Sequence, residues 1–140
     1  MTRREMGLAL PWLAASAQGA PRPALLAAAV YPYESLPVKK NGANASRQVL
    51  DGLSHTGFHI DLHETELAPG AAPHDAHSHA HEEIVLIREG TLEFTIAGKA
   101  TQAGPGSVTY MASNIHHGLR NAGTTTARYF VIALGRALAT

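Results

Sequence analysis

The sequence predicts an all-β domain, built as a sandwich or barrel of short strands. From Tyr31 onward, short apolar or alternating segments recur at a spacing of roughly eight to twelve residues. Turn residues separate these segments, and the chain has 13 glycines and 8 prolines. No segment in this part has sustained helical periodicity, so strands are the consistent interpretation.

Five strands can be placed in order along the chain. In the first, Phe58, Ile60 and Leu62 alternate with polar residues, which is the period of a strand with one buried face. The turn at Pro69-Gly70 ends it. The other four are apolar or alternating segments between Gly-containing turns, at residues 83–88, 92–96, 107–111 and 128–134.

Length and composition limit the function. A chain of 140 residues suffices for one domain with its own core. Eleven basic and eleven acidic residues balance, which argues against a nucleic-acid surface or an anionic-membrane surface. The absence of cysteine excludes thiolate nucleophiles, disulfides and iron–sulfur clusters. Nine histidines, seven of them between His55 and His81, indicate metal or acid–base chemistry.

The first 29 residues differ from the rest. Arg3 and Arg4 precede a short apolar stretch over residues 9–17, a pattern that resembles a twin-arginine export signal with cleavage near Ala17 or Ala29. The stretch is too short to span a membrane permanently. We expect export to the periplasm of a bacterium, or a cytoplasmic protein if this segment is instead an arm that packs on the barrel. Residues 30–140 form the predicted β domain.

Two segments carry the residues for metal chemistry. On a strand, His77 and His79 have the same parity, so both imidazoles project from one face. Glu83 begins the next apolar segment, and His117 follows the Gly104-Pro105-Gly106 break. Three imidazoles and one carboxylate suit divalent manganese, iron, cobalt, nickel or zinc, and disfavour copper(I) and calcium.

These residues carry a resemblance to the cupin family, whose first motif is G-x(5)-H-x-H-x(3,4)-E-x(6)-G. His77, His79, Glu83 and Gly90 match that spacing, while Gly70 lies one residue further upstream. The second motif has P-x-G and then H-x-x-x-N. Gly106, His117 and Asn121 match it, with the proline directly before Gly106 and a longer gap to His117.

The resemblance covers about residues 54–134 and is to small single-domain bacterial cupins of the type-2 conserved barrel family, including quercetinase-like metal cupins. It implies a double-stranded β-helix, or jelly-roll, barrel. It also implies one divalent transition metal ion per chain, held by His77, His79, Glu83 and His117.

Several other polar residues have weaker assignments. His116 is an alternative to His117, but the four-residue step to Asn121 favours His117. The motif places a spacer at His81, so we expect it near the ligands or on the surface. Asn121 is expected to hold a turn through hydrogen bonds. The candidates for a catalytic acid or base are His63, His74 and Tyr110, each chosen only by its proximity in the pattern.

The resemblance leaves three functions open, because fold and metal site do not name a reaction. The first is a metal-dependent enzyme of the dioxygenase, isomerase or lyase type, acting on a small oxygenated organic molecule. The alternative is a non-catalytic module that binds or senses a small, sugar-like molecule through its metal. In the third, the metal is structural.

A homodimer is also expected. Both faces of the segment over residues 128–134 are apolar. One face fills the barrel, so the other needs cover from the N-terminal segment or a second subunit, and unpaired sheet edges favour association.

Overall fold

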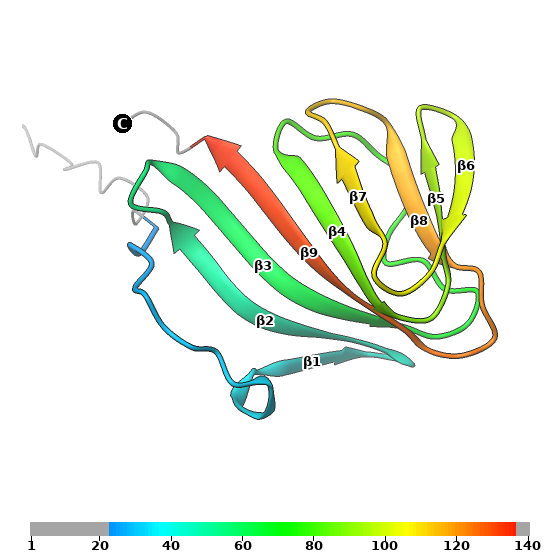
Figure 1. Ribbon diagram of the computed structural model, residues 1–140, viewed down its shortest axis with the longest axis horizontal. Helices are drawn as coiled ribbons and strands as arrows, with labels where there is room; N and C mark the ends of the chain where they lie inside the picture. The colour runs from blue at the N-terminus through cyan, green and yellow to red at the C-terminus, as the bar shows by residue number, and fades with distance from the viewer. Residues whose placement is uncertain (1–22, 137–140) are drawn as a thin grey trace, which may run out of the picture.

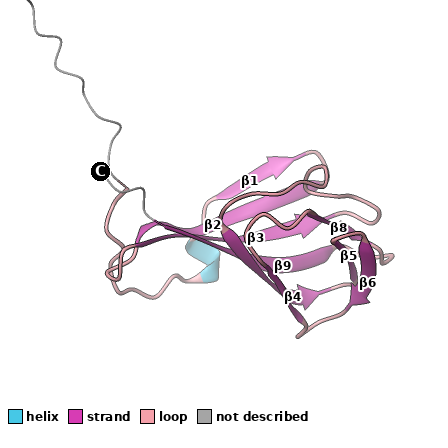
Figure 2. Cartoon of the chain, turned by 90° about the horizontal axis from the view of Figure 1, so that it is seen from above, coloured by secondary structure: helices cyan, strands magenta, loops and turns pink. Residues whose placement is uncertain are grey.

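The computed structural model describes residues 23–136, and nearly all of its regular structure is strand (Figure 2). Residues 1–22, which hold most of the predicted export signal, lie outside the described residues. One helical turn and nine strands follow in order: η1 (Tyr33–Ser35), β1 (Val38–Asn41), β2 (Asn44–Leu53), β3 (Phe58–Leu67), β4 (Glu82–Glu89), β5 (Leu92–Ile96), β6 (Lys99–Ala103), β7 (Val108–Met111), β8 (His117–Asn121) and β9 (Ala127–Arg136).

The strands form two antiparallel sheets (Figure 1). The large sheet has the order β1-β2-β3-β9-β4-β7, and the small sheet has the order β6-β5-β8. The last strand is inserted between β3 and β4, which requires long crossovers rather than a simple meander. The prediction of an all-β domain is confirmed.

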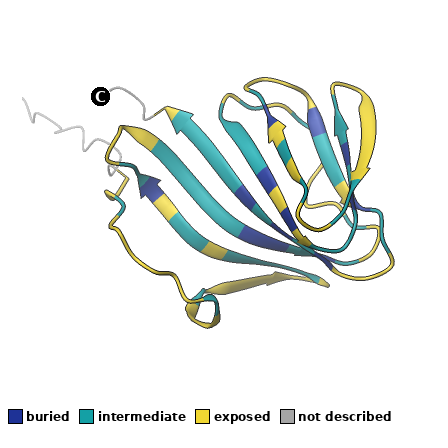
Figure 3. Ribbon diagram, viewed as in Figure 1, coloured by how far each residue is buried: buried dark blue, intermediate teal, exposed yellow. Residues whose placement is uncertain are grey.

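All five strands expected from the sequence are present, with slightly different ends. The expectation missed β1, β2, β6 and β8. Their sequences lack a clear apolar alternation, as in VKKN for β1 and KATQA for β6. Figure 3 shows these two edge strands as almost wholly exposed, so they have no buried face to mark them in the sequence.

The core lies between the two sheets. The large sheet contributes Val85, Ile87, Tyr129 and Val131, and the small sheet contributes Leu92 and Phe94, all of them buried. Alternation along β9 turns Tyr129 and Val131 inward and leaves Phe130 and Ile132 on the outer face, half-buried. This strand therefore has two apolar faces, as the sequence indicated.

A glycine closes the turn from β4 to β5. Gly90 has a φ of +84°, and a Cβ there would lie 2.7 Å from the Cα of Ala127. Only glycine allows β9 to approach this closely. The close approach of β9 therefore explains why a glycine stands at the end of the first sequence motif.

Strand β9 is not an edge strand. It pairs with β3 over ten residues and with β4 on its other side, so its backbone groups are already hydrogen-bonded on both edges. Two subunits cannot pair through the edges of this strand. Any contact that it makes with a second subunit must use its outer face.

The described part of the predicted N-terminal segment pairs with the end of β2. Leu25 and Leu53 form a parallel bridge. The amide of Leu26 donates to the carbonyl of Leu53 at 2.9 Å, and the amide of Leu53 donates to that of Ala24 at 2.8 Å. Cleavage near Ala29 would remove these bonds, whereas cleavage near Ala17 would keep them. Export itself stays a prediction.

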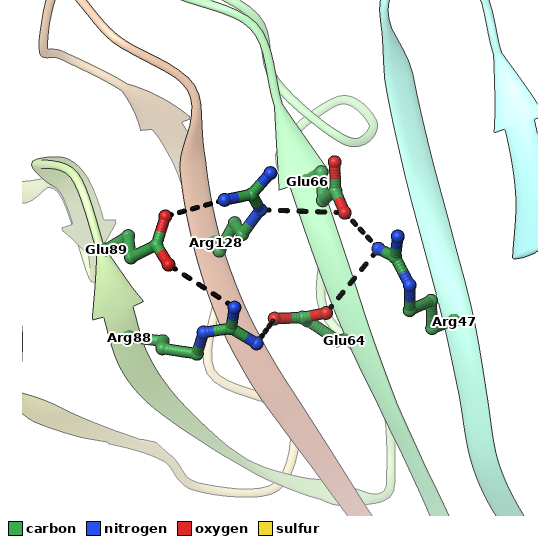
Figure 4. Close-up of polar contacts among 6 residues, drawn as sticks. All are labelled: Arg47, Glu64, Glu66, Arg88, Glu89 and Arg128. Atoms are coloured by element: carbon green, nitrogen blue, oxygen red, sulfur yellow. Dashed lines mark hydrogen bonds and ion pairs between the residues drawn. The ribbon is translucent and has the colours of Figure 1, made fainter. Parts of the chain in front are cut away.

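A closed ring of alternating charges lies on the outer face of the large sheet (Figure 4). Each arginine contacts two glutamates and each glutamate two arginines. The carboxylate of Glu64 has no exposed surface, and it lies 2.7 Å from Arg88 and 3.6 Å from Arg47. The ring is completed by Arg47–Glu66, Glu66–Arg128 at 3.6 Å, Arg128–Glu89 at 2.7 Å and Glu89–Arg88 at 3.3 Å.

A β-bulge and an aromatic ring support this ring of charges. A β-bulge between Ile87 and Glu89 lets the consecutive residues Arg88 and Glu89 both join it. The Tyr33 ring of η1 lies 4.8 Å from the guanidinium carbons of both Arg47 and Arg88. Cation–π contacts therefore hold the segment before β1 against the sheet.

Among residues 23–136, no helix has the length and apolar character needed to cross a membrane.

Glu64→Gln should lower the free energy of unfolding by about 3 kcal/mol, because it removes a buried charge and leaves two arginines without full compensation. Urea denaturation would measure this loss. Glu93→Gln is the control, because the partner of Glu93 is Arg120, which is 53% exposed. Removing such a surface pair should change stability little. Equal, small losses in the two variants would contradict a stabilising role for the buried carboxylate.

Candidate metal centre

Backbone hydrogen bonds join the connection between β3 and β4 to strand β8 at two points. The amide of Gly70 donates to the carbonyl of Asn121 at 2.9 Å. Further along, His77 and His117 exchange two backbone hydrogen bonds of 2.9 and 2.8 Å. The connection therefore runs beside β8 like a short extra strand, which brings the two sequence motifs together.

Small and polar residues allow this close approach. A Cβ at Gly118 would lie 2.9 Å from the Cβ of Ala76, so a larger residue would push the connection away. Asn121 is fully buried, and its side chain donates to the carbonyls of Leu67 and Thr125 at 2.9 and 2.8 Å. Asn121 therefore holds the turn through the backbone, as expected, and is not a ligand.

Three of the predicted ligands converge. The ligand atoms of His77, His79 and His117 all lie within 4.8 Å of one another. Their ring centroids are 4.8 to 5.3 Å apart. Three imidazoles from two separate segments thus face a common point, an arrangement that can hold a metal ion.

The tautomers of two of these rings are fixed by the backbone. Nδ1 of His79 donates to the carbonyl of His81, and Nδ1 of His117 donates to that of Ile115, both at 2.8 Å. A carbonyl can only accept, so Nε2 of each neutral ring keeps its lone pair. Both Nε2 atoms are buried without a hydrogen-bond partner. Because metal-bound histidines have this pattern, the donor set fits a divalent transition metal.

Glu83 comes to this cluster from the start of the next strand, as the sequence indicated. The segment from His77 to Glu83 is not one continuous strand, because β4 begins only at Glu82. Glu83 faces inward from the start of β4, and its Oε2 lies 3.4 Å from Nε2 of His79. A turn, and not strand parity, therefore brings the carboxylate to the imidazoles.

Burial keeps His77 neutral. It lowers the pKa of His77, and the nearby His74, His79 and His117 lower it further, while Glu83 acts in the opposite direction. A neutral imidazole binds a metal ion without first losing a proton. The surroundings of His77 therefore favour the metal-binding form at neutral pH.

His81 lies beside the predicted metal ligands and not on the open surface. Its ring stacks on that of His79 at 3.6 Å, and His79, His81 and Glu83 form a second group of ligand atoms within 4.8 Å. Burial lowers the pKa of His81, with a further contribution from His79, whereas the charges of Glu83 and Asp61 act to raise it. His81 thus belongs to the immediate surroundings of the predicted ligands.

Two other histidines are placed clearly. His116 is exposed, whereas His117 is only 4% exposed, so the two neighbours point to different sides as expected. His74 is exposed and its ring stacks on that of His77 at 4.2 Å. His74 therefore lies at the solvent side of the cluster.

Tyr110 lies outside the site. Its strand partner is Ile84 on the outer face, while Met111 pairs with Glu83 on the inner face. The Tyr110 hydroxyl donates to Glu82 at 2.6 Å, and the residue is 56% exposed. The proximity of Tyr110 in the sequence is therefore misleading, because neighbouring strand residues face opposite ways.

His63 lies on the inner face, on the same side of the large sheet as Glu83. Its Nδ1 is 2.7 Å from Oδ1 of Asp61. Asp61 is not among the site residues predicted from the sequence. The period-two pattern of β3 was a usable signal, since it gives Asp61 and His63 the same parity.

Two antiparallel β-sheets with a core between them define the class of small jelly-roll barrels, and this one carries a histidine cluster that could hold a metal ion. The family profile for the cupin domain matches residues 63–133, and the chain belongs to the cupin family. The predicted cupin barrel is therefore confirmed.

Solved structures support the fold. KdgF from a Halomonas species is similar with a TM-score of 0.64 at 15% identity, over 76% of this chain and 94% of that one. A predicted oxalate decarboxylase from Thermotoga maritima gives 0.64 at 20% identity, over 76% and 99%. The polyketide cyclase RemF from Streptomyces resistomycificus gives 0.60 at 17% identity, over 82% and 87%. A search of curated proteins finds no match.

His117→Ala should lose most bound metal, and the His77→Ala/His79→Ala double variant should lose all of it, because each removes part of the ligand shell. Metal analysis of protein purified without an affinity tag would measure this. His116→Ala is the matched control: it removes an exposed imidazole one residue away and should leave metal content unchanged. Full metal content in the double variant would exclude this site.

Proposed function

We propose that this cupin is a metal-dependent enzyme that acts on a small oxygenated organic molecule. The observation that carries the proposal is the pair of buried, unpartnered Nε2 atoms of His79 and His117. With His77 and Glu83, these residues would hold one divalent ion per chain, of manganese, iron, cobalt, nickel or zinc. The open reaction classes are oxygenation, isomerisation and lyase chemistry.

The charge of the ligand set indicates the kind of substrate. Three neutral imidazoles and one carboxylate leave a residual charge of about +1 on a divalent ion, which attracts a hydroxyl or carboxylate oxygen. A bound ion would supply Lewis acidity or activation of dioxygen at that oxygen. The side chains of His79 and Glu83 are 17% and 14% exposed, so the cluster is not fully closed to solvent, although Nε2 of His79 itself is buried.

The residues around the predicted ligands favour a catalytic metal over a purely structural one. Val85 and Val131 are buried on the inner face, one row of the sheet from Glu83. Apolar walls exclude bulk water and strengthen electrostatic interactions with a bound substrate. His74 and His81 stack on predicted ligands and offer further ring nitrogens beside them.

A substrate screen tests the proposal. Metal-replete wild-type protein should convert at least one compound among flavonols, diketones, keto acids and sugar derivatives, with or without oxygen. The His77→Ala/His79→Ala variant should lose about a hundredfold or more in rate, because the substrate oxygen no longer has its binding partner. His116→Ala should retain full rate. If compounds bind at the metal and none is converted, a binding or sensing module becomes the better assignment.

We also propose that the outer face of the large sheet binds a second copy of the chain. Neighbouring strands present a contiguous apolar surface there: Phe58, Ile60, Leu62, Ile84, Leu86, Val108, Tyr110, Phe130, Ile132 and Leu134. Four of these remain largely exposed, with Phe58 at 47%, Leu86 at 42%, Val108 at 58% and Tyr110 at 56%. Monomeric proteins rarely expose apolar patches of this extent. A two-fold contact would cover the same face on both subunits.

Light scattering at micromolar concentration should give twice the chain mass of 14.8 kDa. Leu86→Lys should shift the protein toward monomer, because it places a charge in the contact. Val30→Glu is the control, since Val30 is 88% exposed and lies outside the sheet. A monomeric wild-type protein would exclude the dimer.

A further inference from the structure

An aspartate–histidine pair lies on the inner face of β3, apart from the predicted metal ligands. Nδ1 of His63 is 2.7 Å from Oδ1 of Asp61, and the two side chains are 30% and 29% exposed. An ionised carboxylate only accepts hydrogen bonds, so Nδ1 carries a proton, and in the neutral ring Nε2 keeps its lone pair. In that form the pair leaves a basic ring nitrogen on a residue of the inner face.

The register of the sheet places Asp61 opposite Glu83 and His63 in the next row. Asp61 pairs with Ala133, and Ala133 pairs with Glu83, so all three project from the same face in one row. His63 projects from this face too, in the neighbouring row with Val131 and Val85. Two steps between strands separate β3 from β4 by about 10 Å. The residue between the two carboxylates is Ala133, whose side chain is only a methyl group.

The carboxylate of Asp61 is itself held in place. Its Oδ2 accepts from Nε2 of Gln48 on β2 at 3.3 Å. Gln48 also donates to the carbonyls of Leu50 and Leu62 at 2.9 and 3.2 Å, next to a β-bulge in β2. The side-chain amide of Gln48 thus holds the carboxylate of Asp61, which in turn holds the imidazole of His63. A base oriented by a third group is the arrangement that proton-transfer sites use.

We propose that His63 is the proton-transfer residue of this cupin and that Asp61 positions it. Nε2 of His63 takes a proton from a substrate hydroxyl, or from a C–H group beside a carbonyl. The electron pair of the broken bond stays on the substrate, and the carboxylate of Asp61 stabilises the imidazolium. The proton then returns to the product or to water. The proposal rests on the proposed function, since the substrate would lie between His63 and Glu83.

The chain contains a matched control. His59 and Asp51 form a second pair, with Nε2 and Oδ1 2.6 Å apart. Here the partner lies on β2, on the side of β3 away from β9 and β4, and the side chains are more exposed, at 40% and 56%. His59 projects from the same face as His63, but its ring is held toward β2, and its Nε2 already contacts Asp51. If any surface histidine could transfer the proton, substitution of His59 and substitution of His63 would have equal effects on the rate.

The first test is the tautomer of His63 in the zinc-loaded protein, from ¹⁵N chemical shifts of the imidazole. We expect Nδ1–H in the wild type and a shift toward Nε2–H in Asp61→Asn, because the amide can donate to Nδ1. An Nε2–H tautomer in the wild type would overturn the proposal.

The second test follows exchange of C–H protons of pyruvate and dihydroxyacetone with D₂O in the presence of zinc-loaded protein. Wild-type protein should accelerate exchange, and His63→Gln should slow it by about a hundredfold. Asp61→Asn should slow it less, and His59→Gln should stay within about twofold of wild type. Addition of free imidazole should restore part of the rate in His63→Ala.

Metal content of the same samples separates this proposal from the proposed function. Slow exchange with full metal content in His63→Gln supports the proton-transfer role. Exchange at the wild-type rate in His63→Gln, or no exchange by the wild type with either probe, overturns it. The proposed function fails separately, if metal-loaded protein converts no compound of the substrate screen.

Discussion

The two hydrogen bonds between the backbones of His77 and His117 are the contact on which the site depends. They join the connection after β3 to the start of β8, which are forty residues apart in the chain. The same contact sets the distance between the rings of two predicted ligands. Gly118 makes it sterically feasible, and Asn121 fixes the turn that follows. A metal centre assembled in this way needs the whole barrel to be folded, because no single segment supplies its ligands.

The two buried ring nitrogens give this arrangement its chemical direction. An unpartnered polar atom in a protein interior costs free energy. Two such atoms, Nε2 of His79 and Nε2 of His117, face the same point, and a bound ion there would remove this cost. The carbonyls of His81 and Ile115 select the tautomer that leaves those nitrogens available. The backbone therefore contributes as much as the side chains to a cluster that could bind a cation.

The sequence predicts the parts of this protein that depend on local pattern. The spacing of His77, His79 and Glu83 identified the cluster. The apolar alternation of β3 and β5, with the continuous apolar segment of β9, identified an all-β sandwich or barrel. It missed β1 and β6, because edge strands with exposed polar side chains carry no buried face. It also misjudged Tyr110, because the pairing of Met111 with Glu83 decides which residue faces inward, and that register is a non-local property. The anchoring of Asp61 by Gln48 depends on the same kind of information, since a bulge in the neighbouring strand sets it.

The charge ring on the back of the large sheet has a consequence for the front. Its six members come from β2, β3, β9 and β4 (Figure 4), the strands that also carry or separate Gln48, Asp61, His63 and Glu83 on the inner face. Sliding of one strand past its neighbour would break ion pairs as well as backbone hydrogen bonds. The ring therefore acts as a transverse brace: it resists shear in the sheet and so fixes the relative positions of these inner-face residues from behind. Geometry at the site is in this way set partly by charges that never face it.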